Sequence, residues 1–222
     1  MLLAIDTSTT QMGLALYDGS QVFAESIWTS RQYHTVELAP ALAGLLARCG
    51  LTMESVSALG VALGPGSFTS LRVGLAFAKG LALARRLPLI GIPTLDVVAA
   101  AQPLAQMPLV AVLHAGRGRL AVGWYTASEN AWRARGPARV ETLDSLAESI
   151  KHPTIICGEL NTEERQRLAR KRVNVVLMSA ANSVRRPAIL AELAWARYQA
   201  GSVDDLAALT PIYLHTAEPV PA

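Results

Sequence analysis

Gly64-Pro65-Gly66-Ser67 has the composition of a loop that could bind phosphate. It follows the apolar run 58–63 and precedes a long apolar segment that starts near Phe68. Backbone N–H groups at the start of a helix attract anions, and glycine-rich turns between a strand and a helix often exploit this. The segment is therefore either a nucleotide-binding loop or a turn that only starts a helix.

The known catalytic motifs that resemble this segment do not fit it. It lacks the Gly-Lys-Ser/Thr of a P-loop, so no lysine is placed to meet the β- and γ-phosphates. It also lacks the Gly-x-Ser-x-Gly of a nucleophile elbow, and Ser67 and Ser70 have no histidine nearby in the sequence. Cys49 stands beside Gly50 at a predicted helix end, where the helix dipole disfavours a thiolate. We therefore expect no catalytic residue.

The four histidines are scattered along the chain, at His34, His114, His152 and His215. Two metal-binding histidines on one helix usually stand four residues apart, so that both rings reach one ion. No pair of these histidines has that spacing. We expect each of them at the surface or in a turn, and we expect no metal.

Length and composition limit the class of protein. A chain of 222 residues suits one large domain or two small lobes. It is 51% hydrophobic and 17% charged, so it either hides surface against a partner or comes from an Ala- and Leu-rich proteome. The net charge of +3 is too small to indicate nucleic-acid binding by itself.

The cysteines and the apolar runs indicate the compartment. The two cysteines, Cys49 and Cys157, form no CxxC motif, which fits a reduced cytosolic setting. The start of the chain does not read as a signal peptide, because Asp6 interrupts it early. No uncharged apolar run approaches the roughly 18 residues that a membrane helix needs. We expect a cytoplasmic location and no membrane.

The hydrophobic pattern predicts two similar halves. Three strands open the chain, the second and third joined by a hairpin turn at Asp18-Gly19-Ser20. A helix that Thr35 can cap, a buried strand, a second helix and another strand follow. The same β-β-β-α-β-α order recurs roughly in the second half and ends with a helix over 185–201. This predicts an α/β fold of two lobes, over 1–102 and 103–222.

Small residues line one side of the helix predicted after Gly64-Pro65-Gly66. Gly74, Ala78 and Ala82 recur every four residues, and a glycine inside a helix costs roughly 1 kcal/mol relative to alanine. Close approach of another helix would offset this cost. That helix is either the neighbour in this chain that carries Leu42 and Leu45, or part of a second protein.

Four segments together resemble one known family. They are AIDTSTTQMGLALYDG near the start, GPGSFTSLRVGLAFAKGLA, PLIGIPTLDVVA and the late PIYLH. This combination is similar to the TsaB (YeaZ) family of the actin, sugar-kinase and Hsp70 superfamily. The resemblance implies two actin-like (ribonuclease H-like) lobes. Each would have a mixed β-sheet with an antiparallel three-strand opening and flanking helices.

The resemblance also implies a function. The family acts as the non-catalytic partner of TsaD, together with the ATPase TsaE. Their complex forms N6-threonylcarbamoyladenosine at position 37 of tRNAs that read codons starting with A. We therefore expect a TsaD-like and a TsaE-like partner, self-association when the chain is alone, and contact with tRNA only through the complex. The Arg-rich helix over 163–172 is a candidate for a minor contact with tRNA phosphates.

The superfamily binds ATP, and its first phosphate loop corresponds to Asp6-Thr7-Ser8-Thr9-Thr10. The loop is either a phosphate-binding loop or, as we favour, a vestige of one that forms a polar hairpin closed by Asx and hydroxyl bonds to the backbone. The sequence leaves open whether a nucleotide binds there. His114 replaces the Asp that many relatives carry in the second lobe, and imidazole cannot replace a carboxylate that holds Mg²⁺. Thr94 and Val98 fall where TsaD-type relatives carry two metal-binding histidines. We therefore expect no cofactor.

The resemblance places the partner interface on the first-lobe helices. The residues we expect there are Leu42, Leu45, Leu71, Gly74, Leu75, Ala78 and Ala82. The alternative function is a stand-alone ATP-dependent small-molecule kinase or ATPase of the same fold. Such an enzyme needs phosphate loops in both lobes and a catalytic carboxylate. The sequence leaves open the roles of His114 and His215.

Overall fold

The computed structural model describes residues 1–30, 33–170 and 174–214. Two compact units make up the chain. The first combines Met1–Val97 with Arg185–Ile212, and the second comprises Val98–Val184 and the residues from Tyr213 onward. The division between the units falls inside helix α3 (Thr94–Ala100).

The first unit is built on a five-stranded mixed sheet in the order β3-β2-β1-β4-β5. Strands β1, β2 and β3 pair antiparallel, and β4 and β5 continue the sheet parallel to β1. The three antiparallel opening strands are as predicted. The strands are β1 (Leu2–Asp6), β2 (Gln11–Tyr17), β3 (Val22–Thr29), β4 (Ala58–Ala62) and β5 (Leu89–Ile92).

The turn between β2 and β3 forms at the predicted Asp18-Gly19-Ser20. The Asp18 carboxylate accepts hydrogen bonds from the backbone N–H groups of Gln21 at 2.7 Å and Ser20 at 2.8 Å. These bonds, with that of Gln21 the largest influence, lower the pKa of the Asp18 carboxyl. Gly19 adopts a φ of 102°, which glycine adopts without a steric penalty.

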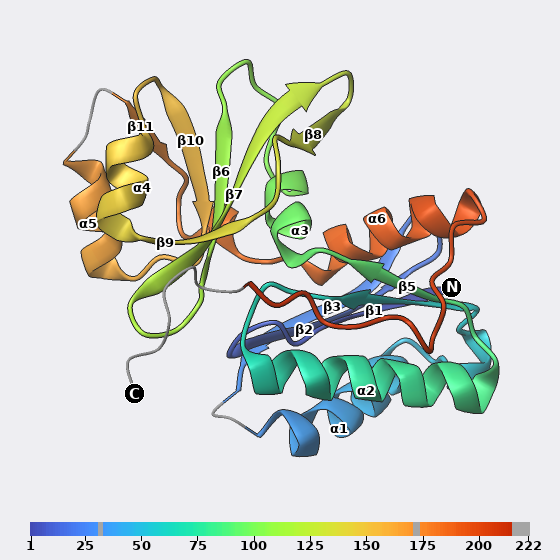
Figure 1. The fold of residues 1–222 in the computed structure, drawn as a ribbon. Coiled ribbons are helices and arrows are strands. Elements are labelled where there is room, and N and C mark those ends of the chain that lie inside the picture. Colours follow the sequence, from blue (N-terminus) through green and yellow to red (C-terminus); the bar gives the residue numbers. More distant parts are fainter. Residues whose placement is uncertain (31–32, 171–173, 215–222) are drawn as a thin grey trace. The chain divides into compact units, whose positions relative to one another are not determined.

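Helices cover both faces of the first sheet, so β1 is buried along its whole length (Figure 1). Leu3 and Ile5 pack on the side of helices α1 (His34–Arg48) and α2 (Phe68–Arg85). Leu2 and Ala4 pack on the opposite side, against helix α6 (Pro187–Gln199). Because successive side chains of a strand point to opposite faces, this single strand contributes to two separate cores.

Helix α6 packs on the first sheet, although the sequence assigned its residues to the second lobe. A Cβ on Gly13 would lie 2.9 Å from Pro187 Cγ, and one on Gly60 would lie 2.8 Å from Ala194 Cβ. These glycines let the helix approach the sheet closely. The predicted division at residues 102 and 103 therefore differs from the structure, in which residues 185–212 belong to the first unit.

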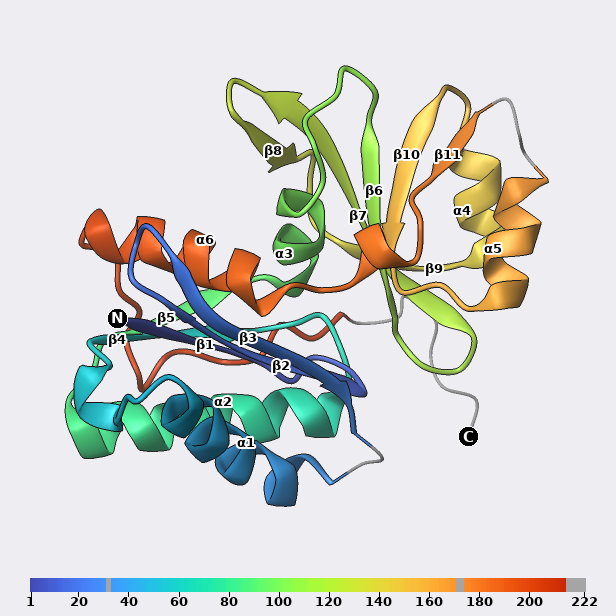
Figure 2. The same cartoon turned by 180° about the vertical axis from the view of Figure 1, so that it is seen from behind.

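The second unit carries its own mixed sheet, in the order β11-β10-β6-β7-β8 with β9 also paired to β7 (Figure 2). Helices α4 (Leu143–Ser149) and α5 (Thr162–Ala169) contribute Leu143, Leu146 and Leu168 to a core on one face of this sheet. The two mixed sheets confirm the predicted fold class. The strands are β6 (Leu109–His114), β7 (Arg119–Ser128), β8 (Ala131–Ala134), β9 (Arg139–Thr142), β10 (Thr154–Gly158) and β11 (Val175–Leu177).

Several local details differ from the sequence prediction. Helix α1 begins at His34 after Tyr33, which makes no side-chain capping bond, so Thr35 does not cap it. The pattern also missed strand β9 and two short 3-10 helices, Met53–Ser55 and Ala181–Ser183. Among the described residues, no helix is long and apolar enough to cross a membrane.

Two glycines of α2 give a direct test of how this helix packs. A Cβ on Gly74 would lie 2.0 Å from Thr7 Oγ1, whereas a Cβ on Gly80 would meet nothing within 4 Å. We expect Gly74→Ala to lower the free energy of unfolding by about 1–3 kcal/mol through overpacking. Gly80→Ala should raise it by about 0.5–1 kcal/mol, because alanine favours the helix. Urea unfolding of both variants measures the difference, and a stabilising Gly74→Ala would contradict this packing.

Candidate functional site

The Asp6-Thr7-Ser8-Thr9-Thr10 loop connects β1 to β2 in the first unit. Asp6 is the last residue of β1, where the strand reaches the end of the sheet. Four of the five side chains are buried, and Asp6 is only 2% exposed. A buried carboxylate needs a partner, because removing its charge from water is costly.

Arg185 supplies that partner from the other end of the chain. Its Nε donates to Asp6 Oδ2 at 2.8 Å, and its Nη1 donates to Thr9 Oγ1 at 2.9 Å. Its Nη2 donates to the backbone carbonyl of Gln11 at 2.5 Å. The Arg185 side chain is 1% exposed, so the ion pair is fully enclosed. The guanidinium lies where a bound cation would face this carboxylate.

The remaining polar groups of the loop also bond within the chain. The other Asp6 oxygen, Oδ1, accepts from the Ser8 backbone N–H at 2.8 Å. Thr7 Oγ1 donates to the Ser70 carbonyl of α2 at 2.7 Å, and Ser8 Oγ lies 2.8 Å from Thr94 Oγ1. The loop thus has the bonding of a closed polar turn.

Gly64-Pro65-Gly66 packs directly against this loop. The Ser67 backbone N–H donates to the Ser8 carbonyl at 2.7 Å. A Cβ on Gly66 would lie only 2.1 Å from that same carbonyl oxygen, so this close approach requires glycine. Gly64 has a φ of 105°, a conformation that L side chains rarely adopt. The glycines therefore have a geometric role in bringing the two turns together.

These residues do not fit the metal–phosphate chemistry of the superfamily. A Mg²⁺ ion needs accessible oxygen ligands, but Asp6 is buried and paired with the Arg185 guanidinium, whose positive charge would repel a second cation. Thr94 is fully buried and bonds Ser8, while Val98 is buried and apolar. The described part of the chain contains no group of three or more His, Cys, Asp or Glu that could hold a metal ion.

The histidines have different surroundings from one another. His114 Nε2 lies 2.9 Å from Glu164 Oε2, and its side chain is substantially exposed, as expected. The expectation for His34 is wrong: it is buried in α1, and its Nε2 lies 3.1 Å from the Thr9 carbonyl. His152 is exposed. The prediction for His215 lies outside the described residues.

The turn between β6 and β7 is a tight hairpin. The Ala115 N–H donates to the Arg119 carbonyl at 2.8 Å, and the Arg119 N–H donates to the Gly116 carbonyl at 3.1 Å. Three consecutive residues, 116–118, have positive φ angles of 78°, 52° and 68°. These bonds make the turn compact without a ligand.

The Cys157 thiol is not a candidate nucleophile. It lies buried in β10, and its Sγ is 3.7 Å from the Val110 carbonyl and 3.9 Å from the Val98 carbonyl. Burial raises the pKa of this thiol to about 12. Because only the thiolate reacts readily, Cys157 is inert at neutral pH.

The residues expected at a partner interface lie inside the first unit. All of them are buried: Leu42, Leu45, Leu71, Gly74, Leu75, Ala78 and Ala82. Gly74 and Ala78 face the chain's own sheet, because α2 packs on β1, β4 and β5. The small-residue face of α2 is therefore covered within the chain, and a charged side chain at Ala78 would disrupt this core.

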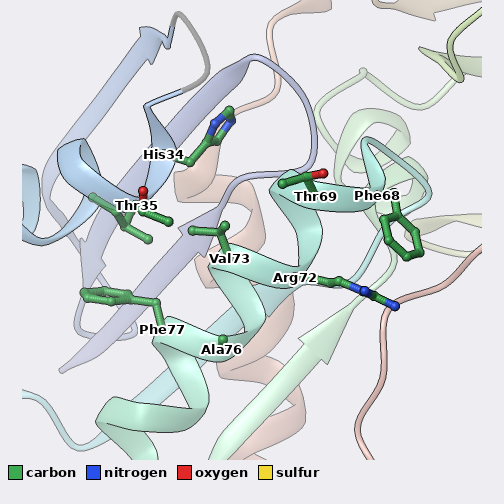
Figure 3. A pocket seen from close by; sticks show the side chains of 9 residues that line it. His34, Thr35, Phe68, Thr69, Arg72, Val73, Ala76 and Phe77 are labelled. Atoms are coloured by element: carbon green, nitrogen blue, oxygen red, sulfur yellow. The ribbon is translucent and has the colours of Figure 1, made fainter.

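The outer sides of α1 and α2 form an apolar groove of about 500 Å³. Val73 and Phe77 point from α2 toward α1, while Phe68 and Arg72 lie on the other flank (Figure 3). Phe68 is 53% exposed, and the Arg72 guanidinium carbon lies 3.7 Å from the centre of its ring. The groove residues are His34, Thr35, Leu38, Phe68, Thr69, Arg72, Val73, Ala76 and Phe77.

The sequence did not reveal Arg185 as the partner of Asp6, and the interface residues predicted on α2 are buried within the chain. Arg185 stands 179 residues from Asp6, and nothing in the Arg-Arg-Pro of residues 185–187 indicates a buried partner. The groove was not predicted, because the four-residue spacing of Gly74 and Ala78 indicates close packing but does not identify the element that packs there. The exposed aromatic Phe68 at the start of α2 was the available signal.

Comparisons with known proteins agree with this architecture. A family model described as TsaD, tRNA N6-adenosine threonylcarbamoyltransferase, matches residues 21–218. The tRNA threonylcarbamoyladenosine biosynthesis protein TsaB of Bacillus subtilis is 29% identical over 221 residues, which cover 98% of this chain and 95% of that protein. TsaB of Escherichia coli is 39% identical over 98 residues, which cover 44% of this chain and 42% of that protein.

The structural comparison gives the same fold. YeaZ from Pseudomonas aeruginosa superposes with a TM-score of 0.79 at 23% identity, covering 96% of this chain and 99% of that one. The two mixed sheets and this likeness define an α/β protein with an actin-like fold. Within that class the chain belongs to the TsaB (YeaZ) family. This membership supports a role in the biosynthesis of tRNA threonylcarbamoyladenosine.

The adjacent Arg185 and Arg186 form a matched pair for testing the buried ion pair. Arg185→Met leaves Asp6 buried without its partner, and we expect a loss of about 3–5 kcal/mol in the free energy of unfolding. Arg186 bonds Glu25 at 2.7 Å, but its side chain is 51% exposed. Arg186→Met should therefore cost only about 0–1 kcal/mol. Denaturant unfolding measures both.

A double variant tests whether the partner of Arg185 is Asp6. Asp6→Asn combined with Arg185→Met should lose less stability than the sum of the two single changes, because their shared interaction is counted once. Strict additivity of the two losses would contradict the pairing.

Proposed function

We propose that this chain is the non-catalytic partner subunit of the complex that forms N6-threonylcarbamoyladenosine at position 37 of tRNAs reading A-starting codons. Its partners would be a TsaD-like catalytic subunit and a TsaE-like ATPase. The observation that supports this most is the combination of family membership with a phosphate loop whose Asp6 is already paired to Arg185. A protein with such a loop contributes surfaces rather than nucleotide chemistry.

The groove between α1 and α2 is the surface we assign to the TsaD-like subunit. It is apolar, its lining residue Phe68 is 53% exposed, and Val36, which follows the lining residue Thr35 in α1, is 68% exposed. Exposed apolar patches of this kind typically mark protein contacts. When the partner is absent, a second copy of this chain can cover the same groove, which accounts for the expected self-association.

Reconstitution tests the proposed function directly. The TsaD-like and TsaE-like proteins from the same source are incubated with tRNA, ATP and an activated threonylcarbamoyl donor, threonylcarbamoyl adenylate, whose AMP is the leaving group, with and without this chain. We expect the modified nucleoside to form only when the chain is present. Equal modification without it would contradict the role. Tight binding of ATP with Mg²⁺ and hydrolysis by the isolated chain, measured by calorimetry and phosphate release, would instead support the kinase or ATPase alternative.

Ala76→Glu tests the groove without removing any core side chain. Ala76 is exposed on α2 and lines the groove, so the glutamate adds charge and bulk only where the partner would sit. We expect binding of the TsaD-like subunit to weaken at least about tenfold, since an unpaired charge buried at an interface costs several kcal/mol. Calorimetric titration of the purified proteins measures this.

Ala169→Glu is the matched control for this variant. It makes the same substitution at an exposed helical alanine, in α5 of the second unit. It should leave binding of the TsaD-like subunit unchanged, and both variants should keep the thermal stability of the unmodified chain. Normal binding by a folded Ala76→Glu variant would exclude the groove as the interface.

A further inference from the structure

The second unit has a groove in which a tryptophan is surrounded by arginines. On β7 the side chains of Leu120, Val122, Trp124 and Thr126 point to the same face, because strand side chains alternate. Leu120 and Val122 are buried in the core that contains residues of α4 and α5. Trp124 is half-buried at the edge of that core, and Thr126 is exposed. This face of β7 is therefore buried at Leu120 and Val122 and becomes open to solvent from Trp124 onward.

Strand pairing brings three arginines to this same face. Arg139 of β9 pairs with Val122, and Arg133 of β8 pairs with Thr126. The Arg135 N–H donates to the Trp124 carbonyl at 2.8 Å, which places Arg135 opposite the tryptophan. Cross-strand partners project on the same side of a sheet. All three arginines are exposed.

The space beside Trp124 is a groove of about 350 Å³. Figure 2 shows the segment between β8 and β9 returning alongside β7. Glu141 is the one acidic residue of the lining, against two arginines. The lining residues are Val122, Trp124, Arg135, Gly136, Pro137, Arg139 and Glu141.

These arginines differ from those of α5, where the sequence suggested a contact with tRNA. Arg165 donates to the carbonyls of Leu160 and Met178, and Arg167 pairs with Asp144. By contrast, the guanidinium groups of Arg133, Arg135 and Arg139 make no hydrogen bond or ion pair within residues 1–30, 33–170 and 174–214. Their positive charge is available to a ligand.

We propose that this groove binds a single-stranded segment of RNA. Arg135 and Arg139 contact successive phosphates, and the exposed part of the Trp124 indole stacks on a base. Arg133 extends the positive track along the same face. Aromatic platforms next to basic side chains are the usual means of holding unpaired RNA. The inference rests on the proposed function, in which the RNA is the tRNA that the complex modifies.

The key experiment removes the two charges and compares an equally charged control. Arg135→Gln with Arg139→Gln is tested against Arg117→Gln with Lys151→Gln, which neutralises two exposed basic residues elsewhere in the same unit. Each chain is assembled with the TsaD-like and TsaE-like proteins, and binding of fluorescently labelled tRNA is measured by anisotropy between 50 and 300 mM salt. Modification rates are measured at several tRNA concentrations.

We expect the groove variant to bind tRNA about tenfold more weakly. The slope of log affinity against log salt concentration should be less steep by about 1.4, because two phosphate contacts with a single strand are lost. The KM for tRNA should rise while kcat at saturating tRNA stays unchanged. Trp124→Leu should weaken binding about five- to tenfold with little change in salt dependence, and Trp124→Tyr should restore most of the loss.

Three outcomes would overturn the inference. Unchanged tRNA affinity in the folded groove variant is the first. An equal loss in the control variant is the second, because it would reduce the effect to net charge. The third is a groove variant that binds the TsaD-like subunit more weakly while its affinity for tRNA is unchanged, which would make the groove a protein contact.

A further measurement separates this inference from the proposed function. The isolated chain and its groove variant are titrated with a labelled single-stranded RNA oligonucleotide. The chain could bind RNA through Arg135 and Arg139 and still fail to support tRNA modification. That result would refute the proposed function but not the proposal that the groove binds RNA. Conversely, the groove variant could keep its affinity for RNA and fully support modification. That result would refute RNA binding by the groove but not the proposed function.

Discussion

The buried ion pair between Asp6 and Arg185 is the interaction on which the first unit depends. Arg185 stands two residues before Pro187, the first residue of α6, so its contacts with Asp6 and Thr9 fix where that helix starts on the sheet. Arg186 and the Ala188 N–H then bind Glu25 on β3. A desolvated charge pair tolerates little displacement, since each charge is costly to bury alone. The start of α6 is thereby held in place at two neighbouring points.

The same pair closes the loop over residues 6–10. Both carboxylate oxygens of Asp6 are engaged within the chain, one by Arg185 and the other by the Ser8 N–H. The buried turn next to Gly66 has room only for small side chains, and their hydroxyl groups bond other parts of the chain, as Thr7 does with the Ser70 carbonyl and Ser8 with Thr94. A phosphate-loop pattern can thus persist in a sequence for structural reasons alone.

Patterns among residues close together in the sequence predicted most of the fold. Contacts between residues far apart in the sequence could not be predicted. Alternating apolar residues, the Asp18-Gly19 turn and the long apolar helix depend on neighbours in the sequence, and they were placed correctly. The partner of Asp6, the burial of His34 and the sheet to which α6 belongs depend on tertiary contacts that leave no periodic trace. The small residues of α2 showed that something packs closely, but only the structure shows that Thr7 is the neighbour of Gly74.

The return of α6 to the first sheet has a consequence for the order in which the chain can fold during synthesis. The sheet of the second unit lies wholly within Val98–Val184, so all its strands are available once that stretch has left the ribosome. The first sheet is made earlier, yet one face stays uncovered until residues 187–199 emerge. The face that awaits the helix carries Ala4, Ala58 and Gly60 as well as the larger Leu2 and Ile90. Because the small residues that admit the helix present little apolar surface, the uncovered face exposes less apolar area to water than a face built only of large side chains would.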